Sequence, residues 1–398
     1  MEFFTVCNCA YLPKVYALAD SLNMQNGCVL NIVLFDKKRK IKEYEFANIH
    51  WIEDLDVPSF STLSFKYTVI ELTTALKPWL AKFFLKSLPT EKIVFLDPDV
   101  YVYGSFDYLD DLLNDNPFIV TPHYLTPISH GAVNDQQLMR FGNYNLGFFA
   151  ANDSMDSISF LTWWEERCFE NAFDDPQFGV FTDQKWVTLG KLFFDFIYVI
   201  KHPGYNVAYW NLHERTVTSE NEKSHNVNNE NLVFIHFSSF NFNTPSKLSR
   251  NKFDFGANDS GSIEALSEKY KIEVVKYEKS VENNVYSYDY MSNGQYISPT
   301  LRRAYFSCFE EFKDIENPFD SKSVVGKFAS RNNLLTSVGD NYSAMSFKDV
   351  SNNQGKFKFI FFCMRIILRL LGPNKYMSFS RLLVFLSRYH TLPDMWRK

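Results

Sequence analysis

Short apolar runs alternate along the first part of the chain with stretches of helical periodicity. Residues 3–9 and 28–35 are apolar runs, and between them residues 12–22 have apolar side chains at helical spacing. Residues 93–96 form a further run rich in branched and aromatic side chains, which is typical of a buried strand. Strands that alternate with helices predict an α/β fold whose sheet is mostly parallel.

A longer helical pattern spans residues 67–88 and is interrupted by Pro78. The proline predicts two helical pieces that meet near Lys77, because an interior proline breaks the backbone hydrogen bonding of a helix. If Pro78 begins the second piece, Lys77 lies beside unpaired amide groups, a setting that favours an anion such as phosphate. An ordinary surface lysine is the alternative.

Carboxylates follow two of the predicted strands. Asp97-Pro98-Asp99 comes directly after the run 93–96, and Asp36 comes directly after the second strand. The carboxyl ends of parallel strands share one edge of a sheet, and open α/β folds bind their ligands there. These acids could therefore hold a cation and a nucleotide. The alternatives are turn chemistry for Asp97 and Asp99 and a solvated turn for Asp36.

Further polar side chains fall at strand ends or helix starts. Asn145 and Gly147 open a later apolar run, where a glycine would let a ligand or another backbone come close. Asp183-Gln184 opens a helical pattern, and a simple helix cap is the alternative role for Asp183. His236 ends another apolar run, where a structural histidine is the alternative. Two carboxylates and one imidazole suit Mn²⁺ or Mg²⁺.

Composition and charge narrow the class of protein. The net charge of −5 and the pI near 6.0 give no electrostatic footprint for nucleic acid, so no such partner is expected. The six cysteines are scattered without paired spacing, and no apolar run reaches the roughly 20 residues of a spanning helix. No signal-peptide pattern precedes the first strand. We therefore expect a cytoplasmic protein.

Four short motifs, taken in their order along residues 1–250, resemble the nucleotide-sugar glycosyltransferases of the GT-A fold. The similarity is greatest to the glycogenin-like and bacterial galactosyltransferase group. The motifs are Asp97-Pro98-Asp99, Asn145-Leu146-Gly147, Asp183-Gln184 and His236-Phe237. The mix of aromatic, polar and turn residues over positions 202–215 predicts a recognition loop. Within it, residues 203–213 are similar to bacterial proteins of surface-polysaccharide synthesis.

The resemblance implies a role for each motif residue. Asp99 and His236 would bind the metal, Asp97 the metal or the donor ribose, and Asp36 the nucleoside. Lys77 would contact phosphate or the donor sugar, and Asn145 the donor or the acceptor sugar. Gly147 would belong to the donor site, and Asp183 with Gln184 would line the reacting sugar. Ser239 stands where the family has a glycine, so Lys247 or Arg250 is expected to supply a positive contact to phosphate.

The resemblance also implies an activity. It predicts a metal-dependent hexosyltransferase that uses Mn²⁺ or Mg²⁺, takes a nucleotide sugar, expected to be a UDP-sugar, and transfers the sugar to a glycan or lipid-linked acceptor with retention. The rival interpretations are a haloacid-dehalogenase-like phosphatase, with Asp174-Asp175 as its second acidic pair, and a non-catalytic sugar-binding or scaffold protein of the same fold.

The end of the chain changes in character. Residues 1–257 are expected to form the GT-A domain, residues 258–320 a packing segment, and residues 321–355 a flexible linker rich in Asn and Ser. Residues 356–398 hold nine Lys or Arg against one acid. This pattern predicts a helical extension that lies on an anionic membrane surface, at the inner face of the cell membrane. A helix packed on the enzyme is the alternative.

Overall fold

The protein is described by a computed structural model that covers residues 1–130, 133–221, 224–243, 261–280, 285–336, 354–388 and 391–397. Contacts group the chain into two compact units. The first comprises Met1–Pro58 and Val69–Ser287, and the second comprises Ser59–Thr68 and Tyr288–Lys398. The four-part division of the chain that the sequence suggested stays a prediction. Lys247 and Arg250 lie outside the described residues.

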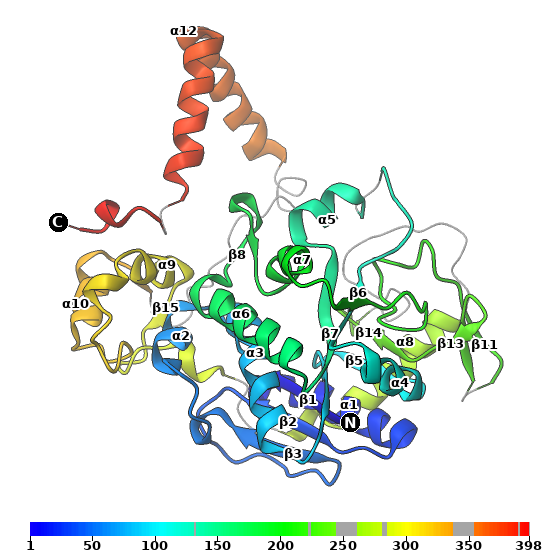
Figure 1. The fold of residues 1–398 in the computed structure, drawn as a ribbon. Helices are drawn as coiled ribbons and strands as arrows, with labels where there is room; N and C mark the ends of the chain where they lie inside the picture. The colour runs from blue at the N-terminus through cyan, green and yellow to red at the C-terminus, as the bar shows by residue number, and fades with distance from the viewer. Residues whose placement is uncertain are drawn as a thin grey trace. The chain divides into compact units, whose positions relative to one another are not determined.

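A seven-stranded sheet forms the centre of the first unit (Figure 1). Its strands follow the order β10-β6-β7-β4-β1-β2-β3, and only β7 runs antiparallel to its neighbours. The strands are β1 (Glu2–Cys7), β2 (Leu30–Leu34), β3 (Ala47–Trp51), β4 (Lys92–Leu96), β6 (Phe118–Pro122), β7 (Tyr144–Asn152) and β10 (Ile197–Val199). The predicted mixed, mostly parallel sheet is confirmed.

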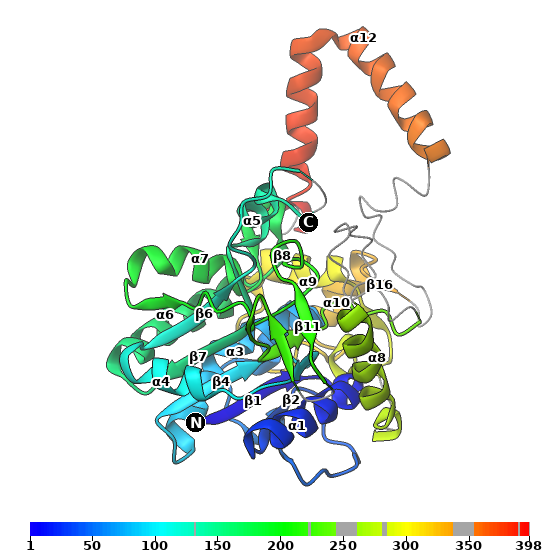
Figure 2. The ribbon, with the colours of Figure 1, turned by 90° about the vertical axis from the view of Figure 1, so that its right-hand side faces the viewer.

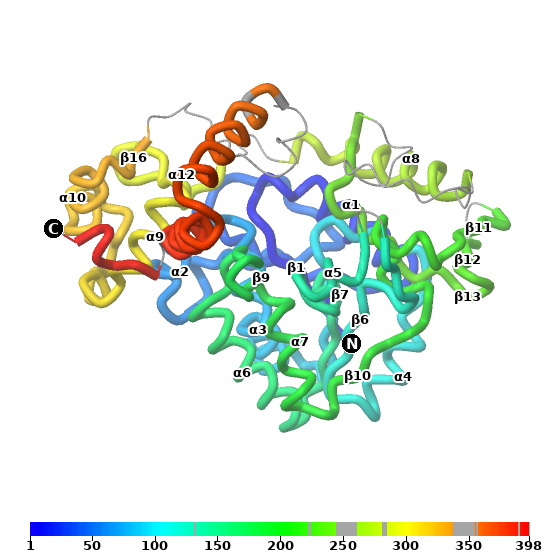
Figure 3. Tube along the Cα trace, turned by 90° about the horizontal axis from the view of Figure 1, so that it is seen from above, coloured from blue at the N-terminus to red at the C-terminus, as the bar shows by residue number. Residues whose placement is uncertain are grey.

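Helices cover both faces of this sheet, and the alternation of side chains along β1 shows how. Phe3 packs against Phe106 at a ring distance of 5.1 Å, whereas Phe4 points to the opposite face and meets Phe84 at 5.1 Å. Helix α1 (Leu12–Asn26) lies on one side of the strands and α3 (Val69–Ser87) and α6 (Met155–Asn171) on the other (Figure 3). Further α-helices in the described part of the unit are α4 (Asp107–Asp115), α5 (Asp135–Phe141), α7 (Gln184–Phe193) and α8 (Gly261–Val275).

Helix α3 continues through Pro78, so the prediction of two helical pieces is wrong. A proline inside a helix costs about 3 kcal/mol, because a hydrogen bond is lost and the ring crowds the preceding turn. Leu72, Leu76 and Leu80 on the same helix are fully buried. Burial of each leucine contributes about 1.5–3 kcal/mol, so packing outweighs the cost of the proline.

Smaller sheets complete the first unit. One two-stranded sheet carries His236. It pairs β5 (Val100–Val102), which directly follows Asp99, with β14 (Phe234–His236). A three-stranded sheet and a two-stranded sheet lie elsewhere in the unit. Their strands are β11 (Val217–Ser219), β12 (His225–Val227), β13 (Glu230–Asn231), β8 (Asp174–Asp175) and β9 (Val180–Phe181).

The second unit has its own core, which holds Phe65, Leu301 and Tyr305. Arg302 is 1% exposed and donates to the carbonyl oxygens of Ser64, Phe65 and Tyr67, which ties the unit's first segment to its later helices. The elements are α2 (Phe60–Lys66), β15 (Tyr296–Ile297), α9 (Pro299–Ser307), α10 (Val324–Arg331), β16 (Leu335–Thr336) and α12 (Gln354–Leu386). Helix α10 and β16 therefore form within the stretch predicted to be a linker.

Helix α12 confirms the predicted helical extension at the end of the chain. It bends at Gly372, whose φ of +73° is left-handed, and continues after Pro373 as a second arm (Figure 1, Figure 2). Among the described residues, no helix combines the length and the apolar character that a bilayer crossing requires.

Candidate metal centre

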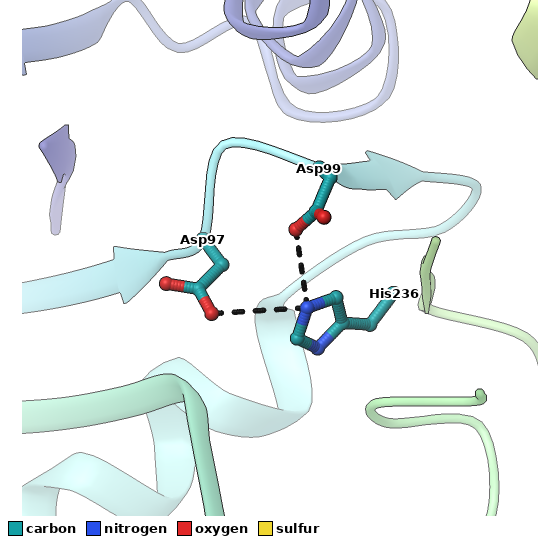
Figure 4. Close-up of side chains that lie close together, drawn as sticks. All are labelled: Asp97, Asp99 and His236. Atoms are coloured by element: carbon teal, nitrogen blue, oxygen red, sulfur yellow. Dashed lines mark ion pairs between the residues drawn. The ribbon is translucent and has the colours of Figure 1, made fainter. Parts of the chain in front are cut away.

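Asp97, Asp99 and His236 converge at the carboxyl edge of the central sheet (Figure 4). Nε2 of His236 lies 3.1 Å from Oδ1 of Asp99 and 3.7 Å from Oδ2 of Asp97. One ligand atom from each of the three residues fits within 4.8 Å of the others. Such a group of two carboxylates and an imidazole has the donor chemistry of a Mn²⁺ or Mg²⁺ site with coordination positions left for a ligand.

Strand pairing accounts for this convergence of residues far apart in the sequence. Asp97 follows β4, and its backbone N–H donates to the carbonyl of Gly147 on β7 at 2.8 Å. The chain then turns at Pro98, and β5 leaves antiparallel to β14 with Val100 opposite His236. The N–H of Phe237 donates to the Asp99 carbonyl at 2.9 Å. The ladder between β5 and β14 thus fixes the histidine beside the second carboxylate.

The two carboxylates are half-buried, and their electrostatic settings differ. Burial alone would raise the pKa of Asp99, but the charge and hydrogen bond of His236, together with Lys14, lower it to about 2. Burial raises the pKa of Asp97, although Lys77 and His236 oppose the shift. The side chains of Asp97 and Asp99 are 23% and 15% exposed, whereas that of His236 is 4% exposed. The carboxylates therefore form the open side of the centre.

Lys77 connects this centre to Asp183 through a buried charge network. Its Nζ lies 3.0 Å from Oδ2 of Asp183 and 3.3 Å from Oδ1 of Asp97, and it donates to the Leu146 carbonyl at 2.9 Å. Burial lowers the pKa of Lys77, but the charges of Asp183 and Asp97 outweigh it and raise the pKa above its ordinary value. The ammonium group has three donors and three acceptors within the protein, so it is held in place as a cation.

An irregularity in β7 supplies the carbonyl groups that these contacts need. Val120 pairs with Phe149, but the next residue, Thr121, pairs with Asn145, so residues 146–148 bulge out of the ladder between β6 and β7. The bulge turns the carbonyl of Leu146 to Lys77 and that of Gly147 to the N–H of Asp97.

Gly147 is also required by the histidine. A Cβ atom at this position would lie 2.3 Å from Cε1 and 2.6 Å from Nδ1 of His236. The predicted close approach at this glycine is therefore, in the structure, the approach of the His236 ring to the backbone.

Asp183 and Gln184 lie at the start of α7, as predicted, but Asp183 does not cap that helix through its side chain. Its carboxylate instead pairs with Lys77 and accepts a hydrogen bond from the Thr182 hydroxyl at 3.1 Å. Thr182 has a φ of +44°, an uncommon conformation for a β-branched residue. Such strained backbone is concentrated at functional sites. Gln184 donates to the Phe141 carbonyl at 2.8 Å.

Asp36 is held by the protein at the same edge of the sheet. Its carboxylate, 1% exposed, accepts from the backbone N–H groups of Cys9 and Ser287, both at 2.8 Å, and pairs with Arg39 at 2.9 Å. Its contact with a nucleoside stays a prediction. Ser239 adopts a φ of +56°, so the serine takes the left-handed conformation that usually favours glycine.

The segment 202–215 is a structural support rather than a surface loop. Tyr205, Asn206, Val207 and Asn211 are fully buried, so the prediction of a recognition loop is wrong for these positions. The reason lies in contacts that the sequence pattern does not show. Asn206 reaches the residues around His236, and Asn211 donates to the carbonyl groups of His123 and Asn206.

Comparisons with known proteins give distant relatives. No family model matches the chain. The uncharacterized proteins YfnF and YfnD of Bacillus subtilis (strain 168) are 26% identical over 172 residues and 24% identical over 206 residues. These matches cover 43% and 51% of this chain and 57% and 63% of the two relatives, so the chain spans less than two thirds of either.

Three of the solved structures that the chain resembles are described as glycosyltransferases. Galactosyltransferase LgtC, in complex with donor and acceptor sugar analogues, is 14% identical with a TM-score of 0.45, and the match covers 71% of this chain and all of LgtC. Glycosyltransferase GlyE of Streptococcus pneumoniae TIGR4 is 14% identical with a TM-score of 0.40, over 71% of this chain and 65% of GlyE. The bifunctional WbbM is 13% identical with a TM-score of 0.38, over 70% of this chain and 52% of WbbM.

Proposed function

We propose that the protein is a metal-dependent glycosyltransferase that takes a nucleotide sugar, expected to be a UDP-sugar, and transfers its sugar to a glycan or lipid-linked acceptor in bacterial surface-polysaccharide synthesis. The observation that carries the proposal is the cluster of Asp97, Asp99 and His236 at the carboxyl edge of the sheet. Ligands bind at this edge in open α/β folds, and a diphosphate would complete the coordination of a cation held there.

Each residue then has a separate task. A bound divalent cation would supply the positive charge that stabilises the departing nucleoside diphosphate. Asp97, Asp99 and His236 would hold that cation. Asp183, with Gln184 beside it, would face the reacting sugar, and we infer that the anomeric configuration is retained.

Lys77 acts in this proposal through its neighbours. Its ammonium group already lies within 3.3 Å of Asp97, Asp183 and the Leu146 carbonyl, so we assign Lys77 the role of holding Asp183 in place beside Asp97. Asn145 uses its oxygen for contacts within the protein, and its amide nitrogen has no hydrogen bond among the described residues. We assign this nitrogen to a sugar hydroxyl.

A screen of nucleotide sugars for Mn²⁺-dependent hydrolysis and transfer tests the proposal. Asp99→Asn should lower kcat/KM by about 10²–10³-fold, the effect of losing one preorganised electrostatic contact. Asp110→Asn is the matched control, because Asp110 pairs with Lys92 at 3.0 Å on the surface of α4 and should leave activity unchanged. NMR of the product should show the donor's anomeric configuration. Full activity in the presence of a chelator would contradict the proposal.

The two rival functions predict different results in the same screen. The phosphatase would prefer a phosphomonoester, and the scaffold would neither hydrolyse nor transfer. Asp174 and Asp175, the second acidic pair of the phosphatase hypothesis, form β8 and do not belong to the carboxylate and histidine cluster found among the described residues. We therefore do not favour the phosphatase.

We also propose that α12 binds an anionic membrane surface at the inner face of the cell membrane. No side chain described in α12 is buried, and residues such as Phe359 and Leu370 are 68% and 80% exposed. Lys358, Arg365 and Arg369 recur at spacings of seven and four residues, which brings their charges to one side of the first arm. Flotation of the full chain with anionic vesicles, but not with neutral ones, is the expected result.

A further inference from the structure

The ring nitrogen of His236 that faces away from the carboxylates lies between two amide groups. In Figure 4 this nitrogen, Nδ1, points away from both Asp97 and Asp99. It lies 3.2 Å from Oδ1 of Asn145 and 3.3 Å from Oδ1 of Asn206. Nδ2 of Asn206 donates to the Thr121 hydroxyl at 2.8 Å and to Oδ1 of Asn145 at 3.1 Å. A single polar network thus surrounds the buried side of the histidine.

One backbone group in this network determines where the protons lie. The N–H of Gly147 meets the Asn145 amide at 3.1 Å, and because a backbone N–H can only donate, the atom that it meets must be the oxygen. This oxygen can only accept, so Nδ1 of His236 must carry a proton. The Asn206 atom next to the same oxygen must likewise be the nitrogen. The Asn206 oxygen is then the second acceptor for the Nδ1 proton.

The position of Asn206 is itself well fixed. Its side chain is fully buried, and its φ of +55° is left-handed, a conformation that asparagine adopts more readily than most residues. Asn211 donates to its carbonyl at 3.0 Å, and Val207, which follows it, accepts from the N–H of His236 at 2.8 Å. The same backbone segment therefore positions both His236 and the Asn206 amide that contacts its Nδ1.

We propose that Asn206 is a positioning residue, which together with Asn145 keeps a proton of His236 on Nδ1, so that Nε2, which faces Asp97 and Asp99, is the ring nitrogen that binds a cation held between them. The inference deepens the proposed metal-dependent function and rests on it. Partners that fix the tautomer of a histidine ligand raise metal affinity, and their loss typically weakens binding by about 10–100-fold. Because Asn145 would still accept from Nδ1, the loss of Asn206 belongs at the lower end of that range.

Asn206→Gly tests the proposal, because glycine removes the amide and still allows the left-handed backbone. The matched control is Asn31→Ala. Asn31 is a buried asparagine on β2 whose oxygen lies 3.1 Å from Nε2 of His50. Two measurements on the full chain are made for wild type and both variants. Long-range ¹H–¹⁵N NMR of ¹⁵N-histidine protein reports which ring nitrogens of His236 carry a proton. Mn²⁺ titration by electron paramagnetic resonance gives the Kd.

In the wild type, Nδ1 of His236 should carry the proton, and His236→Gln identifies the signal. Asn206→Gly should populate the other tautomer and weaken Mn²⁺ binding by about 10-fold, whereas Asn31→Ala should change neither quantity. A wild-type His236 without a proton on Nδ1 overturns the proposal without any variant, as does an Asn206→Gly protein with the wild-type Nδ1 proton and Kd. If the wild type binds no Mn²⁺ but shows the Nδ1 proton that Asn206→Gly loses, the metal-dependent function fails and the assignment of Asn206 stands.

Discussion

The edge of the central sheet and helix α12 depart from the usual distribution of residues in opposite ways. At the sheet edge charged side chains are buried: those of Lys77 and Asp183 are each 3% exposed. In α12 large apolar side chains are exposed, among them Phe359 at 68% and Leu370 at 80%. Both arrangements cost free energy, because burying an ion costs several kcal/mol and exposed apolar area about 25 cal/mol per Å².

The two regions differ in how that cost is offset. At the sheet edge each buried charge has a partner of opposite sign or a carbonyl in the same unit, so the region is complete apart from the cation that its carboxylates would hold. In the described part of α12 no side chain is buried. The sheet edge is therefore organised by folding, whereas α12 is suited to be covered by a partner. Substitutions in the two regions should accordingly affect different quantities.

Lys77→Met should have the largest effect on folding. Removing one partner of a buried ion pair leaves the other charge uncompensated, which costs about 3–5 kcal/mol. Lys82→Met is the matched control on the same helix, because Lys82 pairs with Glu165 at 2.7 Å while both side chains remain partly exposed. Its cost should be below about 1 kcal/mol. Urea denaturation measures both free energies of unfolding.

The double variant Lys77→Met with Asp183→Asn separates charge from packing. If the uncompensated carboxylate causes the loss, neutralising Asp183 should recover a substantial part of the free energy of unfolding. Equal losses for Lys77→Met and Lys82→Met would show that the network at the sheet edge is no more tightly organised than an ordinary half-buried ion pair.

Gly147→Ala should have a smaller effect on folding and a specific effect on the metal centre. The new methyl group would overlap Cε1 of His236, and overpacking of this kind typically costs about 1–3 kcal/mol. The ring must move, so Mn²⁺ binding should weaken as well. Gly261→Ala, where no atom of the described residues lies within 4 Å of the added Cβ, is the control and should change neither stability nor Mn²⁺ affinity. Wild-type affinity in Gly147→Ala would contradict the placement of the ring.

The residues of the centre could be predicted from the sequence, but their support could not. Asp97, Asp99 and His236 each follow an apolar run, and strand ends meet at one edge of a parallel sheet, so their convergence follows from local patterns. The contacts of Asn206 with Thr121 and Asn145 depend on the register shift in β7 and on a left-handed backbone. Neither the register shift nor the left-handed backbone produces a periodic pattern of apolar residues in the sequence.

The sequence of the second unit contains a helical pattern, but the composition of the surrounding residues pointed to a linker. Val325 and Ala329, one helical turn apart, are buried in the core, and this spacing is typical of an amphipathic helix. The many Asn and Ser residues of the surrounding stretch favoured a linker instead. Composition averages over a whole segment, whereas a short helix needs only a few apolar residues at the correct spacing to bury one face.

Arg369→Gln should have the smallest effect and should leave folding unchanged. One cation near an anionic surface contributes about 1 kcal/mol, so partitioning onto vesicles with anionic lipid should fall by about fivefold. The control Lys40→Gln removes an exposed cation of the first unit and should leave partitioning unchanged. Neutral vesicles should show no difference between the proteins. If Lys40→Gln lowers partitioning as much as Arg369→Gln does, attraction is a property of the whole charge distribution, and the exposed apolar residues of α12 require a different partner, such as a second protein.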